Sequence, residues 1–356
     1  MTDRQAYIAF NLTDHVGGAT VARLVEKAGS VAAAWEAFPK KVSRTGGEVL
    51  FEKEESLAAK WGVTILTPAD TGYPKRLLAA PQAPLALYVK GSIEALSKPS
   101  VALVGTRRAT PHGASLATAL AHDLAAASWS VLSGLALGID AAAHRGALDA
   151  EGTTVGVIGS ALDAFYPEEN RALAREIVEK GGAVVSQFPF GRPADQTTFP
   201  IRNHVVAALS SGVVAVECPL RSGTLITTGF AAELGRPVMA FPGRVSDRMS
   251  QGCLHLIREG ATLVRGADDV LEVVSDFFGK KPRASQADAA PSPDPETPPY
   301  SVEEALVMTH VEREGVTIDE LVRETRLPPA RVNALVMELR LKGFVRFLPG
   351  NRIGLA

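Results

Sequence analysis

The sequence predicts an α/β protein whose core is a doubly wound parallel sheet, preceded by a small helical domain and followed by a winged-helix domain. Three observations predict this organisation. Apolar runs alternate with glycine-rich turns and helical segments, short helical patterns precede them, and a proline-rich break leads to three helical patterns and two short apolar runs. A chain of 356 residues has room for two or three domains.

Seven short apolar runs recur between residues 100 and 275, each with a turn and a helical segment around it. They are VALV (101–104), SVLS (130–133), VGVI (155–158), AVVS (183–186), VVAV (213–216), VMAF (238–241) and ATLV (261–264). Runs without polar alternation are typical of strands that are covered on both faces. This pattern predicts a Rossmann-like core.

Composition marks the other boundaries. Residues 279–300 contain six prolines among Ala, Ser and Asp, which excludes a packed element and predicts a linker. We expect a helical domain over residues 1–60, a connecting segment that extends the core over 61–99, the sheet domain over 100–278, the linker over 279–299 and the winged helix over 300–356.

Composition and charge indicate a soluble globular protein. Apolar residues make up 46% of the chain and charged residues 21%, and the formal net charge is −2. So small a net charge neither requires nor excludes a polyanionic partner. The local distribution of charge therefore has to show whether the protein binds one.

The cysteines indicate a reducing compartment, and the amino terminus indicates where the protein is located. Cys218 and Cys253 form no CxxC pair and have no histidines at ligand spacing, so neither a disulfide framework nor a metal site is predicted. The amino terminus lacks a basic region followed by an apolar stretch, and no run of about 18 apolar residues occurs. We therefore expect a cytoplasmic protein without a membrane association.

The residues next to the ends of the predicted strands identify the expected ligand site, because such sheets bind ligands at the carboxyl ends of their strands. They are Gly105, Thr106, Arg107 and Arg108 after the first run, Ser133 and Gly134 at the end of the second, and Gly159 after the third. Small residues let a ligand approach the backbone, and the N–H groups at helix starts favour negative charge. The site is predicted to bind phosphate; ordinary solvated arginines are the alternative.

No cofactor is expected at this site. GxGxxG is absent after the first run, and no acidic residue ends the second run, where ribose recognition would need one. The P-loop pattern GxxxxGK[ST] is absent as well. Classical binding of a dinucleotide or of ATP is therefore disfavoured.

Phe199, Arg202 and Asn203 form a second cluster, at the predicted start of the helix in TFPIRNHVVAALS. This pairing suits single-stranded nucleic acid, because a ring can stack on a base while a guanidinium holds a phosphate. A hydrophobic staple is the alternative for Phe199. Arg107 and Arg202 are both expected outside the core, so replacing either with alanine should weaken binding and leave folding intact.

Asp140 and His144 lie four positions apart on the helix predicted after the second run. They could share a helix face as metal ligands or as an acid and base pair. The alternative is a local hydrogen bond that orients the start of the helix, which we favour because the sequence places no third ligand. Cys218 is expected to be a buried thiol.

Five separated motifs, in order and spacing, resemble one family: VALVGTRRATPHG, SGLALGIDAAAHRGAL, TTVGVIGSALDAFYPEEN, FPIRNHVVAALS and VVAVECPLRSGTLITTGFAAELGRPVMAFPG. They are similar to the DNA-processing protein A family, also called DprA or Smf, over roughly residues 60–265. The resemblance implies a protein that is not an enzyme, binds single-stranded DNA without sequence preference, protects incoming strands and loads the RecA recombinase during natural transformation. It also implies a homodimer formed through the sheet domain, around residues 252–264.

The resemblance also carries site residues to this chain. The Gly-Ser-Arg element of the family falls on Gly105, Thr106 and Arg107, its Ser-Gly pair on Ser133 and Gly134, and its Phe-x-x-Arg-Asn element on Phe199, Arg202 and Asn203. Two positions depart from the family. His204 stands where a further arginine is usual, and Leu137 stands where arginine or lysine is frequent.

An enzymatic function is one alternative. Nucleotide phosphoribohydrolases of the same superfamily have a signature that looks like PGGxGTxxE, with a catalytic glutamate. Here Gly223 and Thr224 are followed three positions later by Thr227, and Glu233 is farther along. The hydrolase interpretation therefore lacks its acid.

The two flanking domains leave further alternatives. Residues 14–38, with a turn at Gly17 and Gly18, resemble a helix-hairpin-helix or sterile-alpha-motif-like module that either contacts phosphate or only packs. The winged helix suggests a regulator that reads duplex DNA, whereas acidic residues in its first two helices favour a protein contact. The basic residues of its third helix are Arg331, Arg340 and Lys342, and those of its wing are Arg346 and Arg352.

Overall fold

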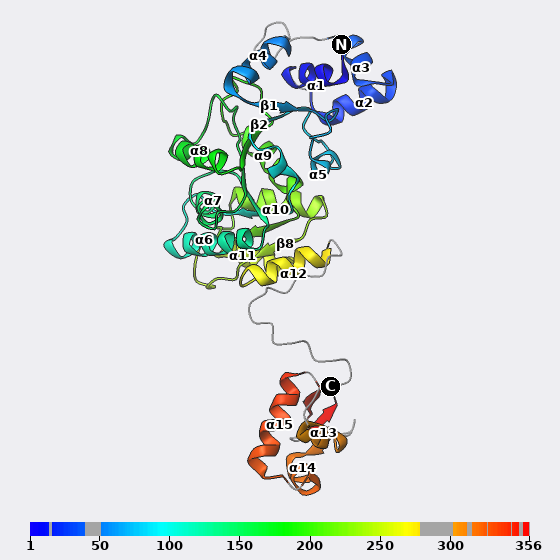
Figure 1. Ribbon diagram of the computed structural model, residues 1–356, viewed down its shortest axis with the longest axis vertical. Helices are drawn as coiled ribbons and strands as arrows, with labels where there is room; N and C mark the ends of the chain where they lie inside the picture. The colour runs from blue at the N-terminus through cyan, green and yellow to red at the C-terminus, as the bar shows by residue number, and fades with distance from the viewer. Residues whose placement is uncertain are drawn as a thin grey trace. The chain divides into compact units, whose positions relative to one another are not determined.

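The computed structural model describes two compact units, Met1–Arg283 and Ala284–Ala356 (Figure 1). The described residues are 1–13, 16–39, 51–277, 302–311, 315–325, 327–342, 344–348 and 352–355. The linker predicted over 279–299 lies outside these ranges, so its boundaries stay a prediction.

A nine-stranded sheet forms the core of the first unit. Its order is β1-β2-β6-β5-β4-β3-β7-β8-β9, and the seven strands from β6 to β9 in this order run parallel. The strands are β1 (Thr64–Leu66), β2 (Leu87–Gly91), β3 (Ser100–Val104), β4 (Ser130–Ser133), β5 (Thr154–Val157), β6 (Ala183–Ser186), β7 (Gly212–Ala215), β8 (Val238–Ala240) and β9 (Thr262–Leu263). The seven parallel strands are the seven predicted runs, so the predicted Rossmann-like core is confirmed.

Helices cover both faces of the sheet, with α6, α7 and α8 on one side and α9 and α10 on the other (Figure 1). Val101 and Leu103 of β3 pack with the first group, whereas Ala102 and Val104 of the same strand pack with α9. Every residue of β3 to β7 is buried, as uninterrupted apolar runs predict. The helices of this part are α5 (Lys75–Leu78), α6 (Pro111–Ala126), α7 (Ile139–Asp149), α8 (Arg171–Glu179), α9 (Thr198–Leu209), α10 (Gly223–Glu233), α11 (Gln251–Arg258) and α12 (Ala267–Phe277).

The strand order reverses at β3, which pairs with β4 on one side and with β7 on the other. The chain therefore adds β4, β5 and β6 in one direction and β7, β8 and β9 in the other. Where the order reverses, the connections that leave neighbouring strands diverge and leave a crevice at the carboxyl ends. This position between β3 and β7 is the switch point of the sheet.

Residues 61–99 extend the sheet by two strands that the sequence pattern did not reveal. β2 pairs antiparallel with β6, and β1 pairs antiparallel with β2. The amino-terminal helices α1 (Asp3–Leu12), α2 (Gly18–Ala28), α3 (Val31–Glu36) and α4 (Phe51–Trp61) lie beside this edge (Figure 1). Helices α1, α2 and α3 pack around Phe10, whose ring meets that of Trp35 edge to face at 5.0 Å, and α4 packs through Ala58 in the cluster that contains Ile8.

The second unit is a winged helix, as predicted. Its elements are α13 (Val302–Thr309), β10 (Val316–Thr317), α14 (Ile318–Thr325), α15 (Pro329–Leu341), β11 (Val345–Leu348) and β12 (Arg352–Leu355). The strands form an antiparallel sheet in the order β10-β12-β11. Leu321, Val332, Leu335 and Ile353 form the centre of its core.

Two further findings concern membranes and metals. None of the described helices is both long and apolar enough to span a bilayer. Within the same residues, no group of three or more His, Cys, Asp or Glu side chains could hold a metal ion.

Cys218 and Cys253 are buried free thiols with their Sγ atoms 3.9 Å apart, which confirms that Cys218 is a buried thiol.

We predict that Gly146→Ala destabilises the protein. Gly146 of α7 lies so close to α6 that a Cβ atom would overlap the backbone carbonyl of Thr118. The two helices would have to separate, and the free energy of unfolding in urea should fall by about 1–3 kcal/mol. Gly229→Ala is the control, because Gly229 is exposed within α10 with open space around it, and it should gain about 0.5–1 kcal/mol. Equal effects of the two substitutions would show that the α6–α7 contact tolerates a methyl group.

Candidate nucleic-acid interface

A groove of about 470 Å³ lies at the carboxyl ends of the strands, at the switch point. We call it the switch-point groove. It is lined by residues that follow β3, β4 and β7 and by the first turns of α9 and α10. The predicted site residues that line it are Gly105, Thr106, Arg107, Arg108, Gly134, Phe199, Arg202 and Asn203.

Two predicted site residues lie elsewhere. Gly159 lines a smaller hollow next to the groove, together with Tyr166 and Phe199. Ser133 is fully buried, and its hydroxyl donates to the carbonyl oxygen of Leu103 at 2.6 Å. The side chain of Ser133 therefore connects β4 to β3 and does not line the groove.

Glu217, which follows β7, connects this strand to the loop after β3 by hydrogen bonds. Its backbone carbonyl accepts from Thr106 N at 2.7 Å, and its buried carboxylate accepts from Thr110 N at 2.8 Å and Thr110 Oγ1 at 2.7 Å. Thr110 in turn caps α6 by accepting from Gly113 N, and Pro111 opens the helix. The loop after β3 thus has a fixed shape, from which Arg107 and Arg108 project.

The turn after β4 contains two unusual backbone conformations. Leu135 has φ 53° although it carries a side chain, and Gly138 has φ 77° at the cap of α7. Buried Asn170 stabilises the turn by donating to the carbonyls of Leu135 at 2.9 Å and Ala136 at 3.0 Å. These bonds offset the cost of the left-handed residue, which is of order 1–3 kcal/mol.

The glycines of the groove mostly make room for protein atoms. A Cβ atom at Gly105 would overlap Ile139, one at Gly134 would overlap the guanidinium of Arg202, and one at Gly138 would overlap the Thr106 carbonyl. Gly223, in contrast, has open space beside it. The close approach that the sequence predicted for a ligand at Gly105 and Gly134 is therefore taken by side chains of the protein.

Arg202 is buried, contrary to its expected place outside the core. Only 5% of the residue is exposed, and Nη1 donates to the carbonyls of Gly134 and of Val157, the latter at 2.6 Å. Burial lowers the pKa of Arg202 to about 10, so the side chain stays protonated at neutral pH. Arg202 therefore ties α9 to the carboxyl ends of β4 and β5.

Asp140 and His144 have different hydrogen-bond partners. The Asp140 carboxylate accepts from Ala136 N at 3.3 Å, which confirms a local hydrogen bond at the start of α7. Burial raises the pKa of Asp140, and attraction to Arg202 opposes that shift. His144 Nδ1 lies 2.7 Å from Thr154 Oγ1. The hydroxyl of Thr154 donates to the Val131 carbonyl, so Nδ1 carries the proton, and buried Nε2 has no partner among the residues that the structure describes.

An exposed aromatic and cationic cluster forms the rim of the groove. The Arg107 guanidinium lies 4.6 Å from the centre of the Phe199 ring, a cation–π contact. The Tyr166 ring lies 6.1 Å from Phe199, and Tyr166 is 49% exposed. Phe199 thus contacts groups that a ligand can reach, which a hydrophobic staple would not require.

The charges of the groove favour an anion. Arg107, Arg108 and Arg221 are exposed, and their guanidiniums form no hydrogen bond or ion pair with any residue that the structure describes. The helices α7, α9 and α10 also begin at the groove, so the positive ends of three helix dipoles point toward it. The lining carboxylate is Asp140, which is buried beside Arg202.

The two departures from the family pattern contribute no fixed positive charge. The His204 ring packs edge to face on Phe230 at 5.3 Å, and burial lowers the pKa of His204. Leu137 is 39% exposed and lines the hollow beside Gly159. Asn203 lines the groove and donates to the Gly223 carbonyl at 3.4 Å.

Sequence reasoning missed four residues of the site: Glu217, Tyr166, Asn170 and Arg221. An acidic residue directly after an apolar run was the available signal for Glu217, and an aromatic residue before proline was the signal for Tyr166. Arg221 follows the fifth run and could have been read like Arg107. Nothing in the local pattern distinguishes Asn170, because its acceptors lie more than thirty positions earlier.

We predict that Arg202→Leu destabilises the fold. The substitution removes the donor of two buried carbonyls and the positive charge that faces buried Asp140. The free energy of unfolding should fall by about 3–5 kcal/mol, measured by urea denaturation. Arg107→Ala is the control and should change it by less than about 0.5 kcal/mol, because Arg107 is exposed. A stable Arg202→Leu protein would contradict the assigned role.

We predict a loss of stability at acid pH that depends on His144. Burial lowers its pKa in the folded protein to about 3, against an ordinary value of 6.5. Between these values the unfolded chain binds the proton and the folded chain does not, so stability falls as pH falls below 6.5. The slope from this residue is about 1.4 kcal/mol per pH unit. Urea unfolding across this range should show a correspondingly shallower slope for His144→Gln; unchanged slopes would refute the assignment.

Comparison with known protein families identifies both units. Residues 64–275 match the family described as DNA recombination-mediator protein A, and residues 288–351 match the DprA winged helix domain. Protein Smf of Escherichia coli (strain K12) is 35% identical over 291 residues, which cover 82% of this chain and 77% of that protein. DNA processing protein DprA of Streptococcus pneumoniae is 42% identical over 202 residues, which cover 57% of this chain and 71% of that protein.

Solved structures agree with these matches. The X-ray structure of DprA from Streptococcus pneumoniae has a TM-score of 0.62 and 32% identity, and covers 76% of this chain and 97% of that one. A structure of DNA processing protein A from Helicobacter pylori, described for its single-stranded DNA binding mode, has a TM-score of 0.54 and 27% identity, with coverages of 61% and 96%. The family is one of recombination mediators and not of enzymes. From the match over its sheet domain and its winged helix, the chain belongs to the DNA recombination-mediator protein A family.

Proposed function

We propose that the protein binds single-stranded DNA without sequence preference in the switch-point groove. This proposal rests on three exposed arginines, Arg107, Arg108 and Arg221, which form no ion pair with a described residue. They lie beside the half-buried ring of Phe199, where three helices begin. Arginines and helix N-termini hold phosphates, and an aromatic ring accepts any base by stacking. The Helicobacter pylori relative, which is described as binding single-stranded DNA, supports the same ligand.

The geometry supports the following assignment of binding residues. Arg107, Arg108 and Arg221 hold phosphates, and Phe199 with neighbouring Tyr166 stacks on bases. Arg202 and Asp140 act as positioning residues, because both are buried and keep the turn after β4 and helix α9 in place. The remaining predicted residues, Gly105, Thr106, Ser133, Gly134, Gly159 and Asn203, shape the groove and its surroundings.

We propose a wider role, which membership of the family supports. The protein would protect incoming strands and deliver them to a RecA-type recombinase during natural transformation, as a homodimer formed through the sheet domain in the cytoplasm. A recombination mediator needs contacts that do not depend on sequence, and arginine–phosphate and ring–base contacts meet that need.

The hydrolase alternative is disfavoured by the site. Thr227 is buried in α10 at the position where the signature needs a glutamate, and Glu233 is exposed at the far end of that helix. The buried carboxylate of Glu217 is already occupied by Thr110. Release of a free base from nucleoside monophosphates would restore this alternative.

We predict that Arg107→Ala and Phe199→Leu weaken binding to a labelled deoxythymidine oligonucleotide in different ways. Arg107→Ala removes a phosphate contact, so affinity falls and the slope of log K against log salt becomes smaller by about 0.7. Phe199→Leu removes stacking worth about 1–3 kcal/mol and leaves the salt slope unchanged. Fluorescence anisotropy over a salt series measures both quantities.

Arg175→Ala is the control for this experiment, because Arg175 is an exposed arginine in the middle of α8 that does not line the groove. Its affinity and salt slope should match those of the wild type. Normal binding by both groove variants would reject the site, and duplex binding as tight as single-strand binding would favour a regulator that uses the winged helix.

A further inference from the structure

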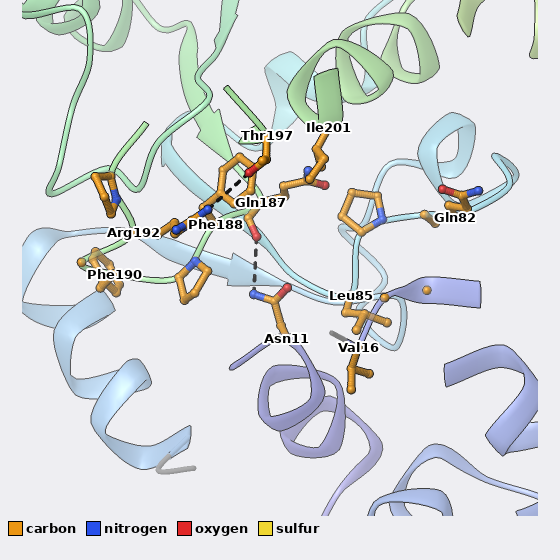
Figure 2. A pocket seen from close by; sticks show the side chains of 17 residues that line it. Asn11, Val16, Gln82, Leu85, Gln187, Phe188, Phe190, Arg192, Thr197 and Ile201 are labelled. Carbon is orange, nitrogen blue, oxygen red and sulfur yellow. Dashed lines mark hydrogen bonds between the residues drawn. The ribbon is translucent and has the colours of Figure 1, made fainter. Parts of the chain in front are cut away.

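A second groove, of about 720 Å³, lies next to the amino-terminal turn of α9 (Figure 2). Thr197 and Ile201 line this second groove, whereas Phe199 and Arg202 line the switch-point groove. The opposite wall comes from the amino-terminal helices and from the segment before β2, where Val16 and Leu85 face each other in Figure 2. The two grooves are thus separated by one turn of one helix.

The second groove carries no free positive charge among its described lining residues. Its lining cation is Arg192, whose Nη2 lies 2.5 Å from Asp195 Oδ2. The ion pair neutralises Arg192, and the same carboxylate group also accepts from Thr197 N at 2.7 Å. The switch-point groove, with three unpaired arginines, suits phosphate, but the second groove suits an uncharged ligand.

The walls of the second groove combine apolar side chains with one hydrogen-bond donor that has no partner among the described residues. Phe188, Phe190 and Leu85 contribute apolar surface. The Nε2 atom of Gln187 has no hydrogen-bond partner among the described residues, although it is shielded from solvent. A buried donor of this kind is rare, and a turn of the Gln187 side chain, which lines the groove, would bring it to an acceptor on a ligand. A nucleobase is a ligand of this kind, because it is uncharged, flat and rich in hydrogen-bond acceptors.

We propose that the second groove receives bases of the same single strand whose phosphates are held in the switch-point groove. The inference rests on the proposed function, and it extends the DNA path across α9 toward the amino-terminal helices. Ile201 and Arg202 are consecutive residues, and a helix with its side chains is about 10 Å wide, so an extended strand can reach both grooves. Continuity with the first groove and the absence of free charge favour this occupant over a separate protein partner.

Gly17 offers a way to block the second groove without disturbing the fold. It lines the groove in extended conformation, with φ −128°, and no atom lies within 4 Å of a Cβ atom built on it. Gly17→Trp should therefore fill the groove. Gly229→Trp is the matched control, because Gly229 also has open space beside it and lines neither groove.

The test compares oligodeoxythymidines of about four and about twelve nucleotides, which bracket the usual site sizes of single-strand binders. Gly17→Trp should bind the short oligonucleotide like the wild type and the long one roughly tenfold more weakly, as expected for the loss of one stacked base. Abasic spacers in the part of the long oligonucleotide beyond the first groove should weaken the wild type and leave Gly17→Trp unaffected.

Each other outcome has a distinct meaning. Unchanged binding of both oligonucleotides by Gly17→Trp overturns the inference, as does equal sensitivity of both proteins to abasic spacers. If the wild type binds no oligonucleotide, the proposed function itself fails. If Gly17→Trp changes only the sedimentation behaviour, a second copy of the chain occupies the groove and the inference is wrong. Should Gly17→Trp fail to fold, Ile201→Ser, on the rim of the groove, replaces it with the same expectations.

Discussion

The arrangement of the site depends on one buried guanidinium. Arg202 reaches from α9 to carbonyl oxygens at the carboxyl ends of β4 and β5, and it neutralises part of the charge of Asp140 at the start of α7. Three elements that are distant in sequence are thereby held at one point. Phe199, one helical turn before Arg202, takes its position beneath Arg107 as a result. The interaction is internal, yet it determines where the exposed groups stand.

Under the proposed function, a sheet typical of cofactor-binding proteins binds a polymer. In dinucleotide-binding proteins, small residues after the first strand let a pyrophosphate approach the helix start. Here the corresponding space beside Gly105 and Gly134 is filled by Ile139 and Arg202. The positive ends of the helices remain, but the enclosed pocket is replaced by an open groove with arginines on its rim. An open groove imposes no limit on the length of its ligand.

Much of the fold could be predicted from the sequence, because strands covered on both faces leave uninterrupted apolar runs. β1 and β2 were missed as strands: they add to the sheet edge beside β6, and the seven-fold alternation of runs and helices does not include them. The site was predictable where it follows strand ends, as at Arg107. The burial of Arg202 could not be predicted, because its carbonyl acceptors lie 45 and 68 positions earlier in the sequence. Only the folded chain brings these groups together. The same reason hides the role of Glu217, which acts on Thr110 across 107 positions.

Under the proposed function, the contact between Arg107 and Phe199 affects which ligands bind the groove. The guanidinium already covers one face of the ring, so a base that stacks there must compete with an internal partner, and the net gain is the difference between two contacts. A nucleotide that brings both a base and a phosphate compensates, because the displaced arginine gains an anion as it leaves the ring. A free base or a simple aromatic compound offers no such compensation. The contact between Arg107 and Phe199 therefore favours ligands that carry a base and a phosphate on one backbone.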